Sequence, residues 1–126
     1  SLATLESIHQ RKTGAMMLAS LRLGALVAGA GPREQTLLED YGRALGLAFQ
    51  ITDDLLDVRG DEAAAGKRLR KDSGRGKLTF PGLLGVDPSV RRAEALVSEA
   101  IRALAPWGAR AGRLEALARY VLERNH

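Results

Sequence analysis

The stretch Gln50-Ile51-Thr52-Asp53-Asp54-Leu55-Leu56-Asp57 places three carboxylates in a segment that is otherwise mainly apolar and has the spacing of a helix. At 100° per residue, Gln50, Asp53 and Asp57 fall together on one side of this helix, with Asp54 on the flank of that side. The opposite side collects residues that are mainly apolar: Tyr41, Leu45, Ala48, Phe49, Thr52, Leu55 and Leu56. The stretch therefore predicts a core helix that presents carboxylates on its far side.

The carboxylates of Asp53 and Asp57 are a like-charge pair one helical turn apart. Such a pair costs an isolated helix about 0.2–0.5 kcal/mol, which favours a cation at this position. Neither His nor Cys stands beside the three aspartates, and hard oxygen ligands such as Asp53, Asp54 and Asp57 suit Mg²⁺ or Mn²⁺ better than zinc. Because proteins usually hold Mg²⁺ with one or two carboxylates and substrate phosphates, the triad predicts a phosphorylated ligand. The alternative is an ordinary solvated acidic patch.

The composition indicates one helical domain. The chain has 126 residues, 45% of them hydrophobic, with 14 glycines, few aromatics and no cysteine. This length supports a real core, and the lack of cysteine excludes a disulfide framework. No apolar run reaches roughly 18 residues and no signal-peptide pattern is present, so we expect a cytoplasmic protein without membrane insertion. The net charge of +4 favours anionic partners.

The N-terminal half of the chain predicts two helices around the opening stretch. Residues 15–27 are apolar on most sides, as in a helix enclosed by others, so we expect Met16 and Met17 in the core. Glycines at 29 and 31 end that segment, and Pro32 suits the first turn of the next helix. This second helix carries the carboxylates and is expected to stop near Gly60.

The C-terminal half predicts a long loop and three further helices. Residues 60–77 combine glycines with lysines and arginines, as in a basic loop. A short helix is expected over 78–84 and a longer one from Asp87-Pro88, with Val90, Ala93, Val97, Ile101 and Leu104 on one face. After a break that holds Trp107, expected in the core, a last helix presents Leu114, Leu117, Ala118, Val121 and Leu122. No segment alternates like a strand, and the predicted fold class is all-α.

Several segments together resemble the trans-isoprenyl diphosphate synthases (the polyprenyl synthetase family), and bacterial farnesyl and geranylgeranyl diphosphate synthases are nearest in character. GLAFQITDDLLDVRGD (46–61) followed by GKRLRKDSGRGKLTFPGLLG (66–85) looks like the second aspartate-rich region of the family. IHQRKTGAMMLASLRLGALVAG (8–29) resembles its lysine-threonine helix, and ALARYVLERNH (116–126) resembles its C-terminus. The matches follow the family's order at compatible spacings and cover nearly the whole chain.

This resemblance implies roles for the matching residues. Asp53 and Asp57 would bind Mg²⁺ that bridges to the diphosphate of the allylic substrate, with Asp54 as a further ligand or a nearby acceptor. Gln50 would help to position that diphosphate, and Phe49 would face the isopentenyl side of the pocket. The remaining expected contacts are Lys12, Lys67 and, less directly, Lys77 to the diphosphate, Thr13 near the allylic cation, and Arg124 towards isopentenyl diphosphate.

The implied reaction is the condensation of an allylic diphosphate with isopentenyl diphosphate. Mg²⁺ and the lysines would take up negative charge as the diphosphate departs. The double bond of isopentenyl diphosphate would attack the allylic cation, and a proton would then be lost. An apolar bundle interior would keep water from the cation.

The sequence departs from the family in one large respect. The family has a first aspartate-rich motif on an earlier helix, and that motif is absent from residues 1–126. We therefore expect the C-terminal half of a single isoprenoid synthase domain, homodimeric when intact, with little or no prenyl transfer by this chain alone. Helices that normally pack on the other half would expose apolar faces and favour self-association.

Two other functions stay open at this point. A non-catalytic subunit resembling a prenyl synthase would keep the fold, although such a protein could lose the aspartates, and all three are present. A basic helical module that binds nucleic acid would suit the net charge, but no recognition helix or aromatic interleaving supports it, and the acidic triad would repel phosphates. Individual residues also have ordinary interpretations: Lys12 as a solvated charge, Thr13 as a helix cap, and Phe49 as a core side chain.

Overall fold

The computed structural model describes residues 1–4, 15–64 and 79–124, with the backbone alone for 61–64; within these ranges it contains helices and turns and no strand. In chain order the helices are α2 (Ala15–Ala28), α3 (Pro32–Ala64), α4 (Phe80–Leu84), α5 (Val86–Ala103), the 3-10 helix η2 (Ala105–Ala111) and α6 (Gly112–Glu123). The predicted all-α class is confirmed.

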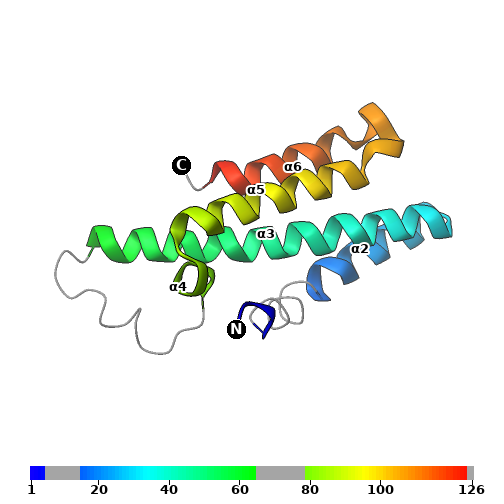
Figure 1. The fold of residues 1–126 in the computed structure, drawn as a ribbon. Helices are drawn as coiled ribbons and strands as arrows, with labels where there is room; N and C mark the ends of the chain where they lie inside the picture. The colour runs from blue at the N-terminus through cyan, green and yellow to red at the C-terminus, as the bar shows by residue number, and fades with distance from the viewer. Residues whose placement is uncertain (5–14, 65–78, 125–126) are drawn as a thin grey trace.

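Helix α3 is the axis of the fold. It has 33 residues and is therefore about 50 Å long at 1.5 Å per residue. In Figure 1 it crosses the whole molecule, with α5 and α6 along one side and α2 on the other. Helix α5 packs along α3 more extensively than any other described element. The opening stretch thus lies on the helix that α2, α4, α5 and α6 all contact.

The start of α3 follows local sequence chemistry, whereas its end does not follow the prediction. Gly29 takes a φ of +76°, a conformation that glycine adopts without steric cost, and the Glu34 carboxylate accepts a hydrogen bond of 2.9 Å from the Gly31 N–H. The predicted stop near Gly60 is wrong, because the helix continues to Ala64. Gly60 has no positive φ, so it weakens the helix interior without ending it.

Two stripes of α3 are buried, one more than the sequence predicted. The stripe with Tyr41, Leu45 and Phe49 lines an apolar cavity together with α2 and α6 side chains. The second stripe, Ala44, Leu47 and Ile51, is buried as well, and its first two residues line a groove opposite Leu96 of α5. Because helices cover α3 on both sides, its buried surface is wider than a single amphipathic face.

Helix α2 is more exposed than its composition suggested. The core position predicted for Met16 is wrong, since this side chain is 73% exposed, whereas Met17 is partly buried against the core. On the same helix Leu23, Leu26 and Val27 are exposed as well. An evenly apolar helix does not reveal which side its neighbours cover. The exposed apolar side chains agree with the expectation that this chain leaves apolar faces uncovered.

The C-terminal elements follow the prediction with small shifts. Thr79 caps α4 by accepting a hydrogen bond from Gly82 N–H at 3.1 Å, and Gly85, with φ +94°, precedes α5. Helix α5 therefore begins at Val86, ahead of the predicted pair of cap and first-turn residue, Asp87-Pro88. Trp107 of η2 packs against the core as expected. In α6, Ala118 and Val121 are buried, whereas Leu117 is nearly half exposed.

Candidate functional site

Asp53 and Asp57 lie on the side of α3 that the other helices leave open. The Asp53 side chain is 46% exposed, and Asp57 is exposed. The two residues are one turn apart on the same helix, about 6 Å along its axis. Their carboxylates therefore face solvent together, as the helical spacing predicted.

Asp54 points in a different direction from its two neighbours. It is 8% exposed and lies among the buried residues. Its Oδ2 accepts a hydrogen bond of 3.3 Å from the Phe80 N–H at the first residue of α4. Phe80 itself is fully buried. Asp54 thus belongs to the second buried stripe of α3 and holds the start of α4, because a buried amide needs an acceptor.

Arg124, at the C-terminal end of α6, lies against the turn that precedes the carboxylates. Its Nη2 donates to the Phe49 carbonyl at 3.1 Å and to the Thr52 hydroxyl at 2.9 Å, and it lies 3.5 Å from Asp53 Oδ1. The guanidinium carbon also stands 4.2 Å from the centre of the Phe49 ring, within the range of a cation–π contact. The structure therefore brings Arg124 together with Phe49 and Asp53.

Phe49 and Gln50 are both half-buried beside this cluster. The Phe49 ring faces an apolar cavity of about 390 Å³, which it lines with Met17, Leu21 and Leu117 among others. The ring therefore packs in the core on one side and meets Arg124 on the other. The core interpretation of Phe49 and its expected place near the site are compatible.

Comparison with known proteins decides the family. The family model described as Polyprenyl synthetase matches residues 1–106. The chain belongs to the polyprenyl synthetase family. The farnesyl diphosphate synthase of Escherichia coli is 45% identical over 128 residues, which cover 98% of this chain and 43% of that protein. The geranylgeranyl diphosphate synthase of Cyanophora paradoxa is 40% identical and is covered to 42%.

Solved structures agree with this assignment. The crystal structure of an FPP/GFPP synthase from Zymomonas mobilis matches with a TM-score of 0.82 and 37% identity, over 96% of this chain and 38% of that one. The chain thus spans well under half the length of the polyprenyl synthetases that it matches. No helix in the described part of the chain is long and apolar enough to cross a membrane.

Several residues of the expected polyprenyl synthetase site are not placed. Lys12, Thr13, Lys67 and Lys77 lie outside the described residues, so the lysine contacts stay predictions. Within the described ranges, no group of three His, Cys, Asp or Glu side chains is gathered in a way that could hold a metal ion. Asp54 is turned inward, which leaves Asp53 and Asp57 as the exposed carboxylates of the triad. Two carboxylates completed by water and phosphate oxygens fit the donor set that Mg²⁺ takes in proteins.

Thr52 and Phe80 are the site neighbours that sequence reasoning missed. Thr52 was assigned to the apolar face, yet its fully buried hydroxyl accepts a hydrogen bond from a residue 72 positions away. Phe80 supplies the amide that binds Asp54, 26 positions upstream. No local spacing connects these pairs, so only the tertiary structure reveals them.

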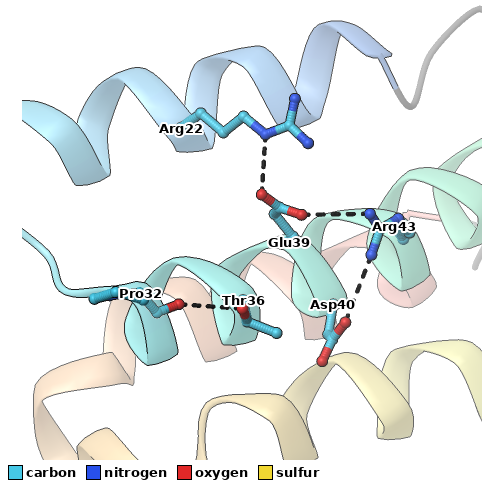
Figure 2. A network of polar contacts seen from close by, with 6 residues as sticks. All are labelled: Arg22, Pro32, Thr36, Glu39, Asp40 and Arg43. Atoms are coloured by element: carbon cyan, nitrogen blue, oxygen red, sulfur yellow. Dashed lines mark hydrogen bonds and ion pairs between the residues drawn. The ribbon is translucent and has the colours of Figure 1, made fainter.

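A separate polar network joins α2 to α3 far from the carboxylates (Figure 2). Glu39 accepts from Arg22 Nε at 3.0 Å and from Arg43 at 3.3 Å, and Arg43 also lies 3.6 Å from Asp40. The hydrogen bond from Arg22 lowers the pKa of Glu39, and the same bond raises the pKa of Arg22. Glu39 is 14 positions before Asp53, about 21 Å along the helix, so this network joins helices and is not part of the site.

Tyr41 provides a second link between helices in this polyprenyl synthetase chain. Its ring is buried, and its hydroxyl donates a hydrogen bond of 2.7 Å to the Leu114 carbonyl in α6. Burial raises the pKa of Tyr41 to about 12, because a buried phenolate would lose its hydration. The contact fixes α6 on α3, and α6 in turn carries Arg124 to the site.

Proposed function

We propose that this chain supplies the second aspartate-rich site of a Mg²⁺-dependent prenyl transferase, which condenses an allylic diphosphate with isopentenyl diphosphate. The observation that carries the proposal is the pair of solvent-accessible carboxylates of Asp53 and Asp57, one turn apart on α3, in a chain of the polyprenyl synthetase family. Relatives named farnesyl and geranylgeranyl diphosphate synthases support the substrate class. The chain would form the C-terminal portion of a single all-α domain, which would be homodimeric when intact.

Each site residue would have its own role in binding the metal ion and the diphosphate. Asp53 and Asp57 would hold Mg²⁺, and Asp54 would keep α4 in place beneath them. When bound, Mg²⁺ would neutralise negative charge on the departing diphosphate. Lys12, Lys67 and Lys77 would contact that diphosphate, Gln50 would orient it, and Thr13 would lie near the cation. The Phe49 ring would shield the reaction from water. Arg124 would lie beside Asp53 and direct its positive charge towards the bound diphosphate.

Binding by this chain alone is the first test. We expect inorganic pyrophosphate to bind in the presence of Mg²⁺ and not without it, as measured by isothermal titration calorimetry. Asp53→Asn should weaken this binding at least about tenfold, since it removes a carboxylate ligand. Asp40→Asn is the matched control, because Asp40 is an exposed aspartate on the same helix, about 20 Å away along its axis. Equal binding with and without Mg²⁺ would contradict the proposal.

Prenyl transfer requires a second test, because we expect the isolated chain to have little or no activity. The C-terminal portion of the Escherichia coli farnesyl diphosphate synthase can be replaced by this chain, which is 45% identical to it. We expect the chimera to condense geranyl diphosphate with isopentenyl diphosphate, and Asp53→Asn to lower kcat/KM about 100-fold or more. A folded chimera that binds magnesium pyrophosphate but turns over no substrate would instead favour a non-catalytic subunit.

A further inference from the structure

The contacts of Arg124 set the charge that an incoming ligand meets at Asp53. Two carboxylates stand on the open side of α3: Asp53, whose side chain is 46% exposed, and Asp57, which is exposed. The guanidinium of Arg124 lies 3.5 Å from one of them, Asp53 Oδ1, and its side chain is only 19% exposed. One positive charge is therefore held beside a pair of negative charges. The pair with Arg124 carries a net charge of about −1 in place of about −2.

The position of Arg124 does not depend on Asp53. Its Nη2 is anchored by two uncharged oxygens, the Phe49 carbonyl at 3.1 Å and the Thr52 hydroxyl at 2.9 Å. The Phe49 ring adds a contact of 4.2 Å to the guanidinium carbon. The Arg124 charge therefore stays beside the carboxylates when Asp53 takes another partner. A charge fixed in advance costs no rearrangement when a ligand arrives.

Burial restricts the Arg124 side chain, which is only 19% exposed. Its Nε is buried and has no hydrogen-bond partner among the residues that the structure describes. Leaving a buried donor unpaired is unfavourable, so the arginine is not placed here for stability alone. One nitrogen, Nη2, makes all of these contacts: its two N–H groups donate to the Phe49 carbonyl and the Thr52 hydroxyl, and the Asp53 carboxylate is attracted by the charge of the guanidinium.

We propose that Arg124 makes this site selective for the metal–diphosphate complex over the free metal ion. This inference rests on the proposed function. Next to Asp53, the guanidinium weakens the attraction of the carboxylates for a free divalent cation. A diphosphate brings several negative charges with its metal, so the same guanidinium strengthens the binding of the complex. Arg124 is thus a positioning residue for the Asp53 carboxylate and a specificity determinant for the ligand.

Arg124→Gln tests the inference through two binding constants that should move in opposite directions. Binding of free Mn²⁺, counted by electron paramagnetic resonance, should become tighter by about two- to thirtyfold. An exposed pair of unit charges changes a binding constant by a factor of roughly 1.4 to 5. A divalent cation carries twice the charge, so the interaction energy doubles and the factor is squared. Binding of magnesium pyrophosphate, measured by calorimetry, should become weaker by a similar factor. A purely structural role would weaken both.

Two further variants control for folding and for charge in general. Arg119→Gln removes an exposed arginine from the same helix, where it pairs with Glu115 at 2.8 Å, and should change neither constant. Arg124→Lys keeps the charge but loses the planar guanidinium that lies over the Phe49 ring, so both constants should fall between those of wild type and Arg124→Gln. If the Gln variant does not fold, as judged by circular dichroism, the opposite shifts in the Lys variant provide the test.

The outcomes separate the inference from the proposed function. If the wild-type chain binds no magnesium pyrophosphate, the proposed function fails and the inference fails with it. If wild type binds the complex but the two constants of Arg124→Gln move in the same direction, or neither moves, the inference alone is wrong. Opposite shifts that are absent from Arg119→Gln support it.

Discussion

The hydroxyl of Tyr41 offers a sharp quantitative test, because it is buried and has one defined partner. It donates to the Leu114 carbonyl at 2.7 Å, so Tyr41→Phe removes one hydrogen bond and leaves the ring in place. Such a loss costs about 0.5–1.5 kcal/mol of unfolding free energy. Near neutral pH we therefore expect the Phe variant to be less stable than wild type by about 1 kcal/mol.

At alkaline pH the order of stability should reverse. Burial raises the pKa of Tyr41 from 10.0 to about 12 in the folded chain. The folded state thus keeps its proton longer than the unfolded state, so this contribution to stability is complete below pH 10 and is lost as pH rises towards 12. The full loss is about 2.7 kcal/mol for two pKa units, and about half of it is reached near pH 11. The Phe variant has no such loss.

Urea unfolding followed by circular dichroism measures both free energies at a series of pH values. The curves of wild type and Tyr41→Phe should cross between about pH 10.5 and about pH 11, where the alkaline loss equals the lost hydrogen bond. Tyr120→Phe is the control for removing a tyrosine hydroxyl, because that ring is 58% exposed. A constant difference between wild type and Tyr41→Phe across this range would refute the reasoning.

Three further changes have defined outcomes. Phe80→Ala empties a fully buried site and should lower the unfolding free energy in urea by about 3–5 kcal/mol; an effect below about 1 kcal/mol would show that α4 does not close the core. Asp54→Ala leaves the Phe80 amide without its 3.3 Å acceptor and should cost about 1–3 kcal/mol, whereas Asp54→Asn keeps an acceptor and should melt closer to wild type. Equal melting temperatures for the two Asp54 variants would argue against that hydrogen bond. The pKa of Glu39 is lowered chiefly by its hydrogen bond with Arg22, so its stabilisation is present above the ordinary pKa of a glutamate and is lost as pH falls through the lowered value. Glu39→Gln should flatten this acid-side loss of stability, and the difference should shrink at high salt; a difference that is unchanged by salt would contradict an exposed ion pair.

Local sequence predicted much of the fold and of the candidate site. The 3.6-residue period alone placed Asp53 and Asp57 together on the open side of α3, with Tyr41, Leu45 and Leu55 in the core. Glycine and proline chemistry predicted the break near residues 29–32, and a second break was expected around Trp107; Gly29 and Gly108 take positive φ values at these two places. These features depend on neighbours within one or two turns, which the sequence displays directly.

The failures share a physical cause. Met16 was expected in the core because its helix is apolar on most sides, yet that pattern does not say which side a neighbouring helix covers. Gly60 was expected to end α3, but a glycine ends a helix only where the chain takes a positive φ, and no positive φ occurs there. In both cases the local sequence allows the predicted structure, a buried side chain or a helix end, but does not require it.

Sequence by itself thus determined the helices, the family resemblance and the pair of exposed carboxylates. The tertiary structure alone decided that Asp54 turns inward to the Phe80 amide and that Arg124 stands beside Asp53. The reason is that direction and partner are set by elements distant in the chain: Arg124 reaches Thr52 across 72 positions. A helical period orders residues around one axis, whereas only the packing of α4 and α6 on α3 determines what each of them meets.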